Sequence, residues 1–297
     1  MKKRPLAGLL MAAPPLLLVT VFVAFPIAVA IAYSLGHVGG LNQTIASIAR
    51  DQHTVDEWWQ VTFGAYTDVF ADERFVRDLI TTVIITLITT VVVVLMAWSI
   101  ALYLRVSDSV AAKVLSALAV VPMFIPVVIA SWAILTFYAG DGFVRTIAVA
   151  LGGSAPTFGY TVVCITIGMI WTQLPFATLM IVSGVQSVPT ALMEAASDAG
   201  ASFFRVVRSV IAPLTLVPTV IAATFTAIGT LGAFTVPYFT GPNAPNMLGV
   251  DMASFFQAFN QPQQAIVMAV VVFVVAAGFG ALYVWANFRS AQDSGRV

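Results

Sequence analysis

The chain has 297 residues, of which 60% are hydrophobic and 9% are charged. A soluble domain usually carries about 25% charged residues, so this composition excludes an ordinary soluble protein and predicts an integral membrane protein. Basic and acidic residues balance to a net charge of zero, and no nucleic-acid partner is expected. The single cysteine, Cys164, excludes an intrachain disulfide and is expected to be a packing residue within an apolar run.

In chain order, six apolar stretches are each long enough to cross a bilayer as a helix, which needs about 20 residues. Transmembrane barrels are instead built from short strands of alternating polarity. The sequence therefore predicts an all-α, polytopic membrane protein with six transmembrane helices, organised as a single permease-like domain over residues 1–297. The expected spans are Leu9–Tyr33, Leu79–Leu104, Val114–Phe137, Tyr160–Val182, Leu214–Ala233 and Ala265–Phe288.

The first span also has the elements of a cleavable signal peptide. Lys2-Lys3-Arg4 precedes an apolar run, and Ala28-Val29-Ala30 would suit a cleavage site. The uncharged run continues past Ser34 and is much longer than a usual signal core, so its length favours a retained helix. A mature protein that begins near Ile31 would contradict this prediction.

Lysine and arginine residues set the expected orientation, because cytoplasmic segments of membrane proteins carry more of them than outer segments do. With the N-terminus inside, most basic residues fall in cytoplasmic segments and most acidic residues fall outside. Both termini and the segment around Glu194 are then cytoplasmic. The inner basic residues are Lys2, Lys3, Arg4, Arg105, Lys113, Arg205, Arg208, Arg289 and Arg296, against Arg50, Arg74, Arg77 and Arg145 outside.

The longest polar segment covers residues 34–78 and is expected to be an extracytoplasmic loop. It contains Trp58-Trp59 and further aromatic residues among its acids. Aromatic residues near a membrane boundary are typically interfacial anchors, although a partner-facing surface is an alternative. Both histidines of the chain, His37 and His53, fall here and are expected to be surface residues rather than metal ligands.

A second polar segment, residues 183–213, separates the fourth and fifth spans. Charged groups at bilayer depth are costly, so this segment is expected to lie in the cytoplasm as a surface for a soluble partner. Val188-Pro189 suits the start of a helix, because proline is tolerated in the first turn. Apolar residues then recur at helical spacing, with Glu194 and Asp198 on the opposite side. Spacing alone equally allows a helix that packs on its own membrane domain.

Gly200 interrupts this helical pattern. A glycine within a helix costs about 1 kcal/mol relative to alanine. Gly200 is therefore expected to end a short helix and to turn the chain into a second helix that leads to the fifth span. Small residues on both sides, Ala195, Ala196, Ala199 and Ala201, leave room for the close approach of another protein.

The run Glu194-Ala195-Ala196, with Gly200 six positions after the glutamate and Pro213 at the end of the pattern, resembles the EAA motif of permease subunits in bacterial ABC importers. Val210 and Ala212 stand where that motif has isoleucine and leucine, and the second departure weakens the match. In topology the resemblance extends across nearly the whole chain, and it implies the type I ABC importer permease fold. It further implies that an ATPase subunit docks on Glu194, Ala195, Ala196, Asp198, Gly200 and Ala201.

The same resemblance implies the partners of the chain. Such a permease pairs with a second permease, identical or homologous, and with two ATP-binding subunits and an extracytoplasmic solute-binding protein. It lies in the lipid bilayer of the bacterial inner membrane, with both termini in the cytoplasm. ATP-driven closure of the ATPases would move the membrane helices through the docking helix. The chain itself would then need no cofactor, because ATP and Mg²⁺ would be bound by the partner subunits.

The residues themselves give no sign of an ATPase or another enzyme. A phosphate-binding loop needs a lysine after a glycine-rich run, and neither the N-terminal lysines nor Lys113 follows such glycines. No catalytic site and no metal site are expected. The interiors of the predicted spans also lack Asp, Glu, Lys, Arg and His, which ion-coupled carriers commonly place near the midplane. A passive channel, lined by polar residues such as Thr226, is the remaining alternative.

The transported solute is predicted only from a finer resemblance. Residues 232–237, Gly241 and Met247-Leu248-Gly249 look like the corresponding stretch of spermidine/putrescine-type permeases, which implies a polyamine or a similar small organic solute. Sugar-type permeases share the fold and much of the docking segment and are the alternative. Aromatic residues of a membrane domain are also common as packing residues. The candidate path residues are Trp171, Gln173, Phe176, Thr226, Phe234 and Asp251.

Overall fold

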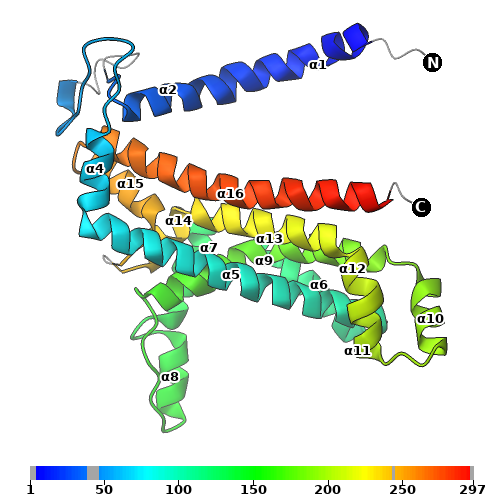
Figure 1. Ribbon diagram of the computed structural model, residues 1–297. Helices are drawn as coiled ribbons and strands as arrows, with labels where there is room; N and C mark the ends of the chain where they lie inside the picture. Colours follow the sequence, from blue (N-terminus) through cyan, green and yellow to red (C-terminus); the bar gives the residue numbers. More distant parts are fainter. Residues whose placement is uncertain (1–4, 39–46, 243–244, 295–297) are drawn as a thin grey trace. The chain divides into compact units, whose positions relative to one another are not determined.

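The computed structural model describes residues 5–38, 47–242 and 245–294. Its regular structure is helical throughout, and no β-strand occurs in these three ranges (Figure 1). The basic residues Lys2, Lys3, Arg4 and Arg296, on which part of the expected orientation rests, lie outside the described residues.

The chain falls into two compact units. Each unit is made of two stretches of the chain that are far apart in sequence. One unit comprises Met1–Phe75 with Asp251–Val271, and the other comprises Val76–Val250 with Val272–Val297.

The helices confirm the all-α membrane fold. Among the described residues, five helical stretches are long and apolar enough to cross a membrane, and a bent pair supplies a sixth. The first, second, fourth and sixth predicted spans are each one continuous helical stretch, ending within a few residues of the expected boundaries. They are formed by α1 (Pro5–Val19), the π-turn η1 (Thr20–Ala24) and α2 (Phe25–Ser34), by α5 (Glu73–Val106), by α9 (Val162–Gln186) and by α16 (Pro262–Ser294).

The prediction of one continuous third span over Val114–Phe137 is wrong, because proline breaks the helix in the middle. Pro126 has no backbone N–H to donate, and it disfavours the helical conformation of the residue before it. Ile125 is accordingly extended, with φ −102° and ψ 125°. Each part of the broken span packs against α9. The parts are α6 (Val110–Val120), the 3-10 turn η2 (Val121–Phe124) and α7 (Val127–Tyr138).

The fifth span begins after a bend at Thr215. Two helical stretches meet there at 72°, and the buried Thr215 hydroxyl donates to the carbonyl of Ile211 within the preceding turn. A polar group deep in the fold is thereby satisfied without a partner from another helix. The stretch before the bend contains α11 (Phe203–Val206), the π-turn η3 (Val207–Ile211) and α12 (Ala212–Leu214), and the stretch after it is α13 (Leu216–Leu231).

Several short helices occupy segments that the hydropathy pattern leaves as loops. One of them lies inside the predicted extracytoplasmic loop 34–78, and α5 also begins within that loop, at Glu73. Residues 39–46 of the loop lie outside the described residues. The short helices are α4 (Gly64–Ala71), α8 (Phe143–Ala150), α10 (Thr190–Asp198), α14 (Thr235–Thr240) and α15 (Leu248–Gln257).

Helix α9 lies at the centre of the unit Val76–Val250, alongside α13 (Figure 1). Small residues permit this close packing, as is usual between membrane helices. A Cβ atom added to Gly184 of α9 would lie 2.6 Å from Cγ2 of Thr215 and 2.7 Å from Cγ of Pro218. On the same helix, Ala177 and Ile181 are fully buried in an apolar cluster. The contact between α9 and the start of α13 therefore depends on the missing side chain at position 184.

Replacing Gly184 with alanine is expected to destabilise the solubilised protein by about 1–3 kcal/mol, the usual cost of overpacking a close-packed core. A lowered midpoint of thermal unfolding in detergent measures the effect. Gly278→Ala is the matched control, because outside its own helix backbone and chain neighbours no described atom lies within 4 Å of the position that its Cβ would take. An unchanged midpoint for Gly184→Ala would contradict the tight contact.

In the unit Met1–Phe75 with Asp251–Val271, the buried Gln263 connects the predicted extracytoplasmic loop to the start of α16. Oε1 of Gln263 accepts from the backbone N–H of His53 at 2.8 Å. Its Nε2 donates to the carbonyls of His53 at 2.9 Å and of Tyr33 at 3.2 Å. His53 itself lies 2.6 Å from Asp68 through Nε2 and is partly exposed. Among the described residues, no group of three or more His, Cys, Asp or Glu side chains is arranged to hold a metal ion.

Candidate functional site

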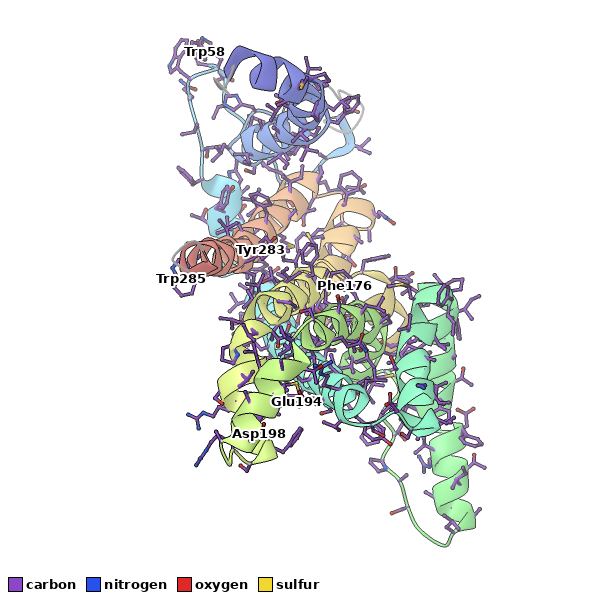
Figure 2. The ribbon with its side chains drawn as sticks, turned by 90° about the vertical axis from the view of Figure 1, so that its right-hand side faces the viewer. Trp58, Phe176, Glu194, Asp198, Tyr283 and Trp285 are labelled. Carbon is purple, nitrogen blue, oxygen red and sulfur yellow. The ribbon has the colours of Figure 1, made fainter. Side chains whose placement is uncertain are left out.

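The predicted docking segment contains a short helix, α10, that presents most of its side chains to solvent. Pro189 precedes the helix in an extended conformation, with φ −59° and ψ 129°, as expected for a residue that flanks a helix start. No residue of α10 is buried. Figure 2 labels Glu194 and Asp198 on this helix, and both are exposed. Met193 of α10 packs against the apolar cluster that includes residues of α5 and α9, so the helix also contacts its own membrane domain.

Gly200 ends α10, as the sequence predicts. Its φ is +81°, in the left-handed region where a side chain is unfavourable. The N–H of Gly200 donates to the carbonyl of Ser197 at 2.9 Å, and the N–H of Ala201 donates to the carbonyl of Ala196 at 3.0 Å. This pair of hydrogen bonds is the Schellman arrangement, which satisfies the last carbonyls of a helix. The chain then reverses into α11.

The six predicted docking residues are thus contiguous and mostly accessible. Glu194, Ala195, Asp198 and Gly200 are exposed, and Ala196 and Ala201 are half-buried. Large apolar side chains extend the same exposed region, since Phe203 is 53% exposed and Phe204 is 75% exposed. Exposed apolar residues next to carboxylates are suited to binding another protein.

Arg105 contacts the start of this helix, and the sequence reasoning missed that role. Its Nη2 donates to the carbonyl of Val188 at 2.7 Å and to the hydroxyl of Thr190 at 3.1 Å, and it lies 3.4 Å from the sulfur of Met193. From the sequence, Arg105 is only one of the basic residues that set the orientation. No local pattern predicts the contact, because it joins residues separated by 83 positions.

The candidate path residues of α9 fall into two groups rather than one. Trp171 lines a cavity of about 340 Å³ together with Ile125 and residues of α7. Gln173 faces α13 instead, since a Cβ added to Gly229 would lie 2.9 Å from its Nε2. Phe176 also faces α13, with its ring centroid 5.4 Å from that of Phe225. Residues two apart on a helix do not share a face, which accounts for the division.

The other candidate path residues lie in different surroundings. Thr226 is fully buried in α13, and Asp251 is fully buried in an ion pair with Arg74. Neither side chain therefore lines an open path in this conformation. Phe234 is 41% exposed, and its ring lies 5.1 Å from that of Tyr238.

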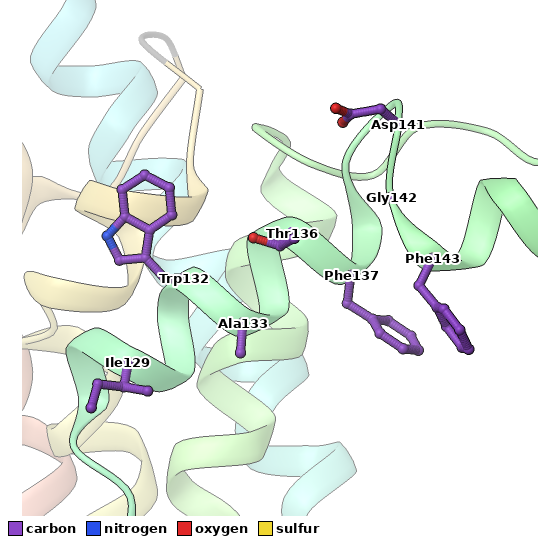
Figure 3. A pocket seen from close by; sticks show the side chains of 8 residues that line it. All are labelled: Ile129, Trp132, Ala133, Thr136, Phe137, Asp141, Gly142 and Phe143. Atoms are coloured by element: carbon purple, nitrogen blue, oxygen red, sulfur yellow. The ribbon is translucent and has the colours of Figure 1, made fainter.

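A second cavity, of about 650 Å³, lies along α7 and the turn to α8. Figure 3 shows the rings of Phe137 and Phe143 next to each other, and their centroids are 5.1 Å apart. Trp132 extends from the other end of the lining, and Asp141 lies on the turn between the helices. The cavity thus combines apolar ring faces with one carboxylate.

Two curated proteins are similar to this chain over most of its length. The sulfoquinovosyl glycerol transport system permease protein of Agrobacterium fabrum is 26% identical over 292 residues, which are 94% of this chain and 89% of that protein. The trehalose/maltose transport system permease protein of Thermococcus litoralis is 26% identical over 259 residues, which are 85% of this chain and 82% of that protein.

The fold is similar to that of solved importers. A chain of a bacterial ABC transporter involved in the import of the acidic polysaccharide alginate superposes with a TM-score of 0.73, covering 98% of this chain and 96% of that chain at 17% identity. This confirms the predicted type I importer permease fold. The expected closeness to spermidine/putrescine-type permeases gains no support from any of these proteins.

A family model decides the class of the protein. It describes the inner membrane component of binding-protein-dependent transport systems, and it matches residues 94–289, which include the fourth to sixth spans and the whole of α10. Proteins of this family are transport permeases of ABC importers and not enzymes. The chain belongs to the family of inner membrane components of binding-protein-dependent transport systems.

Proposed function

We propose that this chain is the permease subunit of an ABC importer for a sugar-containing solute. Membership of the family supports import driven by partner ATPases over a passive channel. The observation that favours a sugar is that both curated relatives, matched over most of their length, are named for sugar-containing solutes. The polyamine expected from the finer resemblance has no comparable support.

The docking of an ATP-binding subunit on α10 is the second part of the proposal. The helix is exposed, it ends in a turn that requires Gly200, and it carries the residues of the EAA motif in register. The orientation that follows has α10 and both termini in the cytoplasm. The expected partners are a second permease, identical or homologous, two ATP-binding subunits and an extracytoplasmic solute-binding protein.

For the translocation path we propose residues on both faces of α9. Trp171 and the cavities along α7 offer aromatic faces, which suit the apolar C–H faces of a sugar ring. Asp141 is a hydrogen-bond acceptor for sugar hydroxyls, as carboxylates are. Gln173, Phe176 and Phe234 extend the proposal to the side of α13 and α14. Thr226 and Asp251 would line the proposed translocation path only after the helices rearrange during transport.

The solute class is tested with the complete transporter, with all its partner subunits, in proteoliposomes. We expect maltose, trehalose or sulfoquinovosyl glycerol, presented by the binding protein, to be taken up in an ATP-dependent manner and to stimulate ATP hydrolysis. Spermidine and putrescine, offered at the same concentrations, are expected to give neither effect. Stimulation by the polyamines alone would overturn the sugar proposal, and uptake without ATP would return the chain to the channel class.

A further inference from the structure

Arg105 stands at the junction of two elements that are far apart in sequence. It lies in the last turn of α5, where a positive charge is favoured by the negative end of the helix dipole. Its side chain crosses to the start of α10 and reaches three atoms there, the Val188 carbonyl, the Thr190 hydroxyl and the Met193 sulfur, at 2.7, 3.1 and 3.4 Å. One guanidinium group therefore holds Val188, two positions before the helix, and two residues of its first turn.

The surroundings of this contact make it a firm attachment. Val188 is 3% exposed and belongs to an apolar cluster that includes Val93, Ala97 and Ala101 of α5. Its carbonyl, at the boundary of this cluster, is satisfied by a charged donor, and hydrogen bonds to charged groups are stronger than neutral ones. Thr190 and Met193 are three positions apart and lie on the same face of the helix, so the guanidinium holds this face of α10 against α5.

Within the part of the chain that the structure describes, no hydrogen bond joins the opposite end of α10 to α5. Gly200 is exposed, and a Cβ there would have no described atom within 4 Å apart from its chain neighbours. A force applied to the exposed face of α10 would therefore reach α5 through the start of the helix, in addition to following the chain to α9 and α11.

We infer that Arg105 is a positioning residue that couples α10 mechanically to α5, so that movement of a docked ATPase reaches the second span directly. The inference rests on the proposed docking function of α10. Arg105 itself is not expected to touch the ATPase, the nucleotide or the solute. Its replacement should therefore change how much transport each ATP hydrolysed produces, and not whether the ATPase binds.

The test compares variants of the complete transporter in proteoliposomes by the ratio of solute uptake to ATP hydrolysis. Maltose, trehalose and sulfoquinovosyl glycerol are the probes. The ratio of uptake to ATP hydrolysis is measured with the one that the wild-type transporter takes up. Arg105→Gln is expected to copurify with normal amounts of ATPase while the ratio falls at least tenfold. Arg105→Lys, which keeps one donor and the charge, is expected to recover part of the ratio.

Lys113→Gln is the matched control. It removes a basic residue from the same predicted cytoplasmic segment, so it changes the expected orientation signal by the same amount. Lys113 is exposed, and its side chain makes no hydrogen bond or ion pair with any residue that the structure describes. The ratio of solute uptake to ATP hydrolysis in Lys113→Gln is expected to equal that of the wild type. If Arg105→Gln does not assemble, Thr190→Val replaces it, since this change removes one acceptor and leaves every charge in place.

A measurement without the ATPase separates this inference from the docking proposal. Spin labels at Val106→Cys and Ala199→Cys, both exposed positions, report the distance between α5 and the far end of α10 in the purified permease. Arg105→Gln is expected to broaden this distance distribution. An unchanged distribution together with an unchanged ratio in Arg105→Gln or Thr190→Val overturns the role of Arg105. A broadened distribution in Arg105→Gln, combined with a wild-type α10 that cannot be crosslinked to an ATPase, would overturn the docking proposal alone.

Discussion

Replacing Gly200 with proline is expected to abolish ATP-dependent uptake while the membrane helices still assemble. Gly200 has a φ of +81°, whereas proline holds φ near −65°. The change also removes the N–H that donates to Ser197 at 2.9 Å. Where the native conformation is incompatible, such a substitution costs well over about 1 kcal/mol, and here the cost falls on the turn that ends α10. The loss of coupled uptake in proteoliposomes, with normal insertion of the chain, measures the effect.

Gly200→Asn and Gly200→Ala are expected to give intermediate levels of coupled uptake. Asparagine visits the left-handed conformation more readily than other residues with a side chain, so Gly200→Asn should retain most of the coupled uptake. Alanine should lie between the two, since the left-handed conformation costs it about 1 kcal/mol. Steric crowding is not the cause, because a Cβ at this position would meet no described atom within 4 Å apart from its chain neighbours. Coupled uptake that survives in Gly200→Pro would show that the geometry of this turn is irrelevant to docking.

The second large effect is expected at the ion pair between Arg74 and Asp251. Nε and Nη2 of Arg74 donate to Oδ1 of Asp251 at 3.0 and 2.5 Å. The Asp251 side chain is fully buried, and the guanidinium carbon of Arg74 lies 5.8 Å from the centre of the Phe259 ring. Asp251→Ala leaves this cation without its counter-charge. Breaking a buried pair by removing one partner costs about 3–5 kcal/mol, and the lower figure applies because Arg74 is 34% exposed.

The thermal unfolding midpoint of the solubilised protein is the measurement, and a double-mutant cycle isolates the pair. Arg74→Met with Asp251→Leu is expected to be much less destabilised than Asp251→Ala, since an apolar pair can replace a buried ion pair at little cost. Glu57→Gln is the control for the loss of an acidic residue, because Glu57 is exposed. A loss of stability in the double variant equal to the sum of the losses in Arg74→Met and Asp251→Leu would mean that the two side chains act independently.

The predicted spans and the end of α10 could both be predicted from the local sequence, for different physical reasons. Spans such as α5 and α9 follow from uninterrupted apolar runs, because a helix in lipid satisfies all its backbone groups within its own segment. The end of α10 at Gly200 was predictable for another local reason, since one residue without a side chain supplies the left-handed turn. Pro126 lies inside an apolar run that is long enough to cross a membrane. Hydropathy alone therefore predicted the third span as a single helix, whereas the backbone forms two separate helices.

The candidate path could not be assembled from the sequence. Trp171 and Gln173 are only two positions apart in the sequence, yet on α9 they face α7 and α13 respectively. Asp251 reads as an acid near a membrane boundary, but its partner Arg74 is 177 positions away. Sequence proximity and residue type do not report which faces of two helices meet.

The sequence by itself determined the membrane class, the approximate spans and the position and end of α10, because each depends on interactions within one stretch of chain. Only the tertiary structure decided that Arg105 holds the start of α10, that Gly184 admits Thr215 and Pro218, and that Asp251 is committed to Arg74. These contacts join side chains from separate helices. They are set by how helix surfaces pack, which the local pattern of apolar residues does not specify.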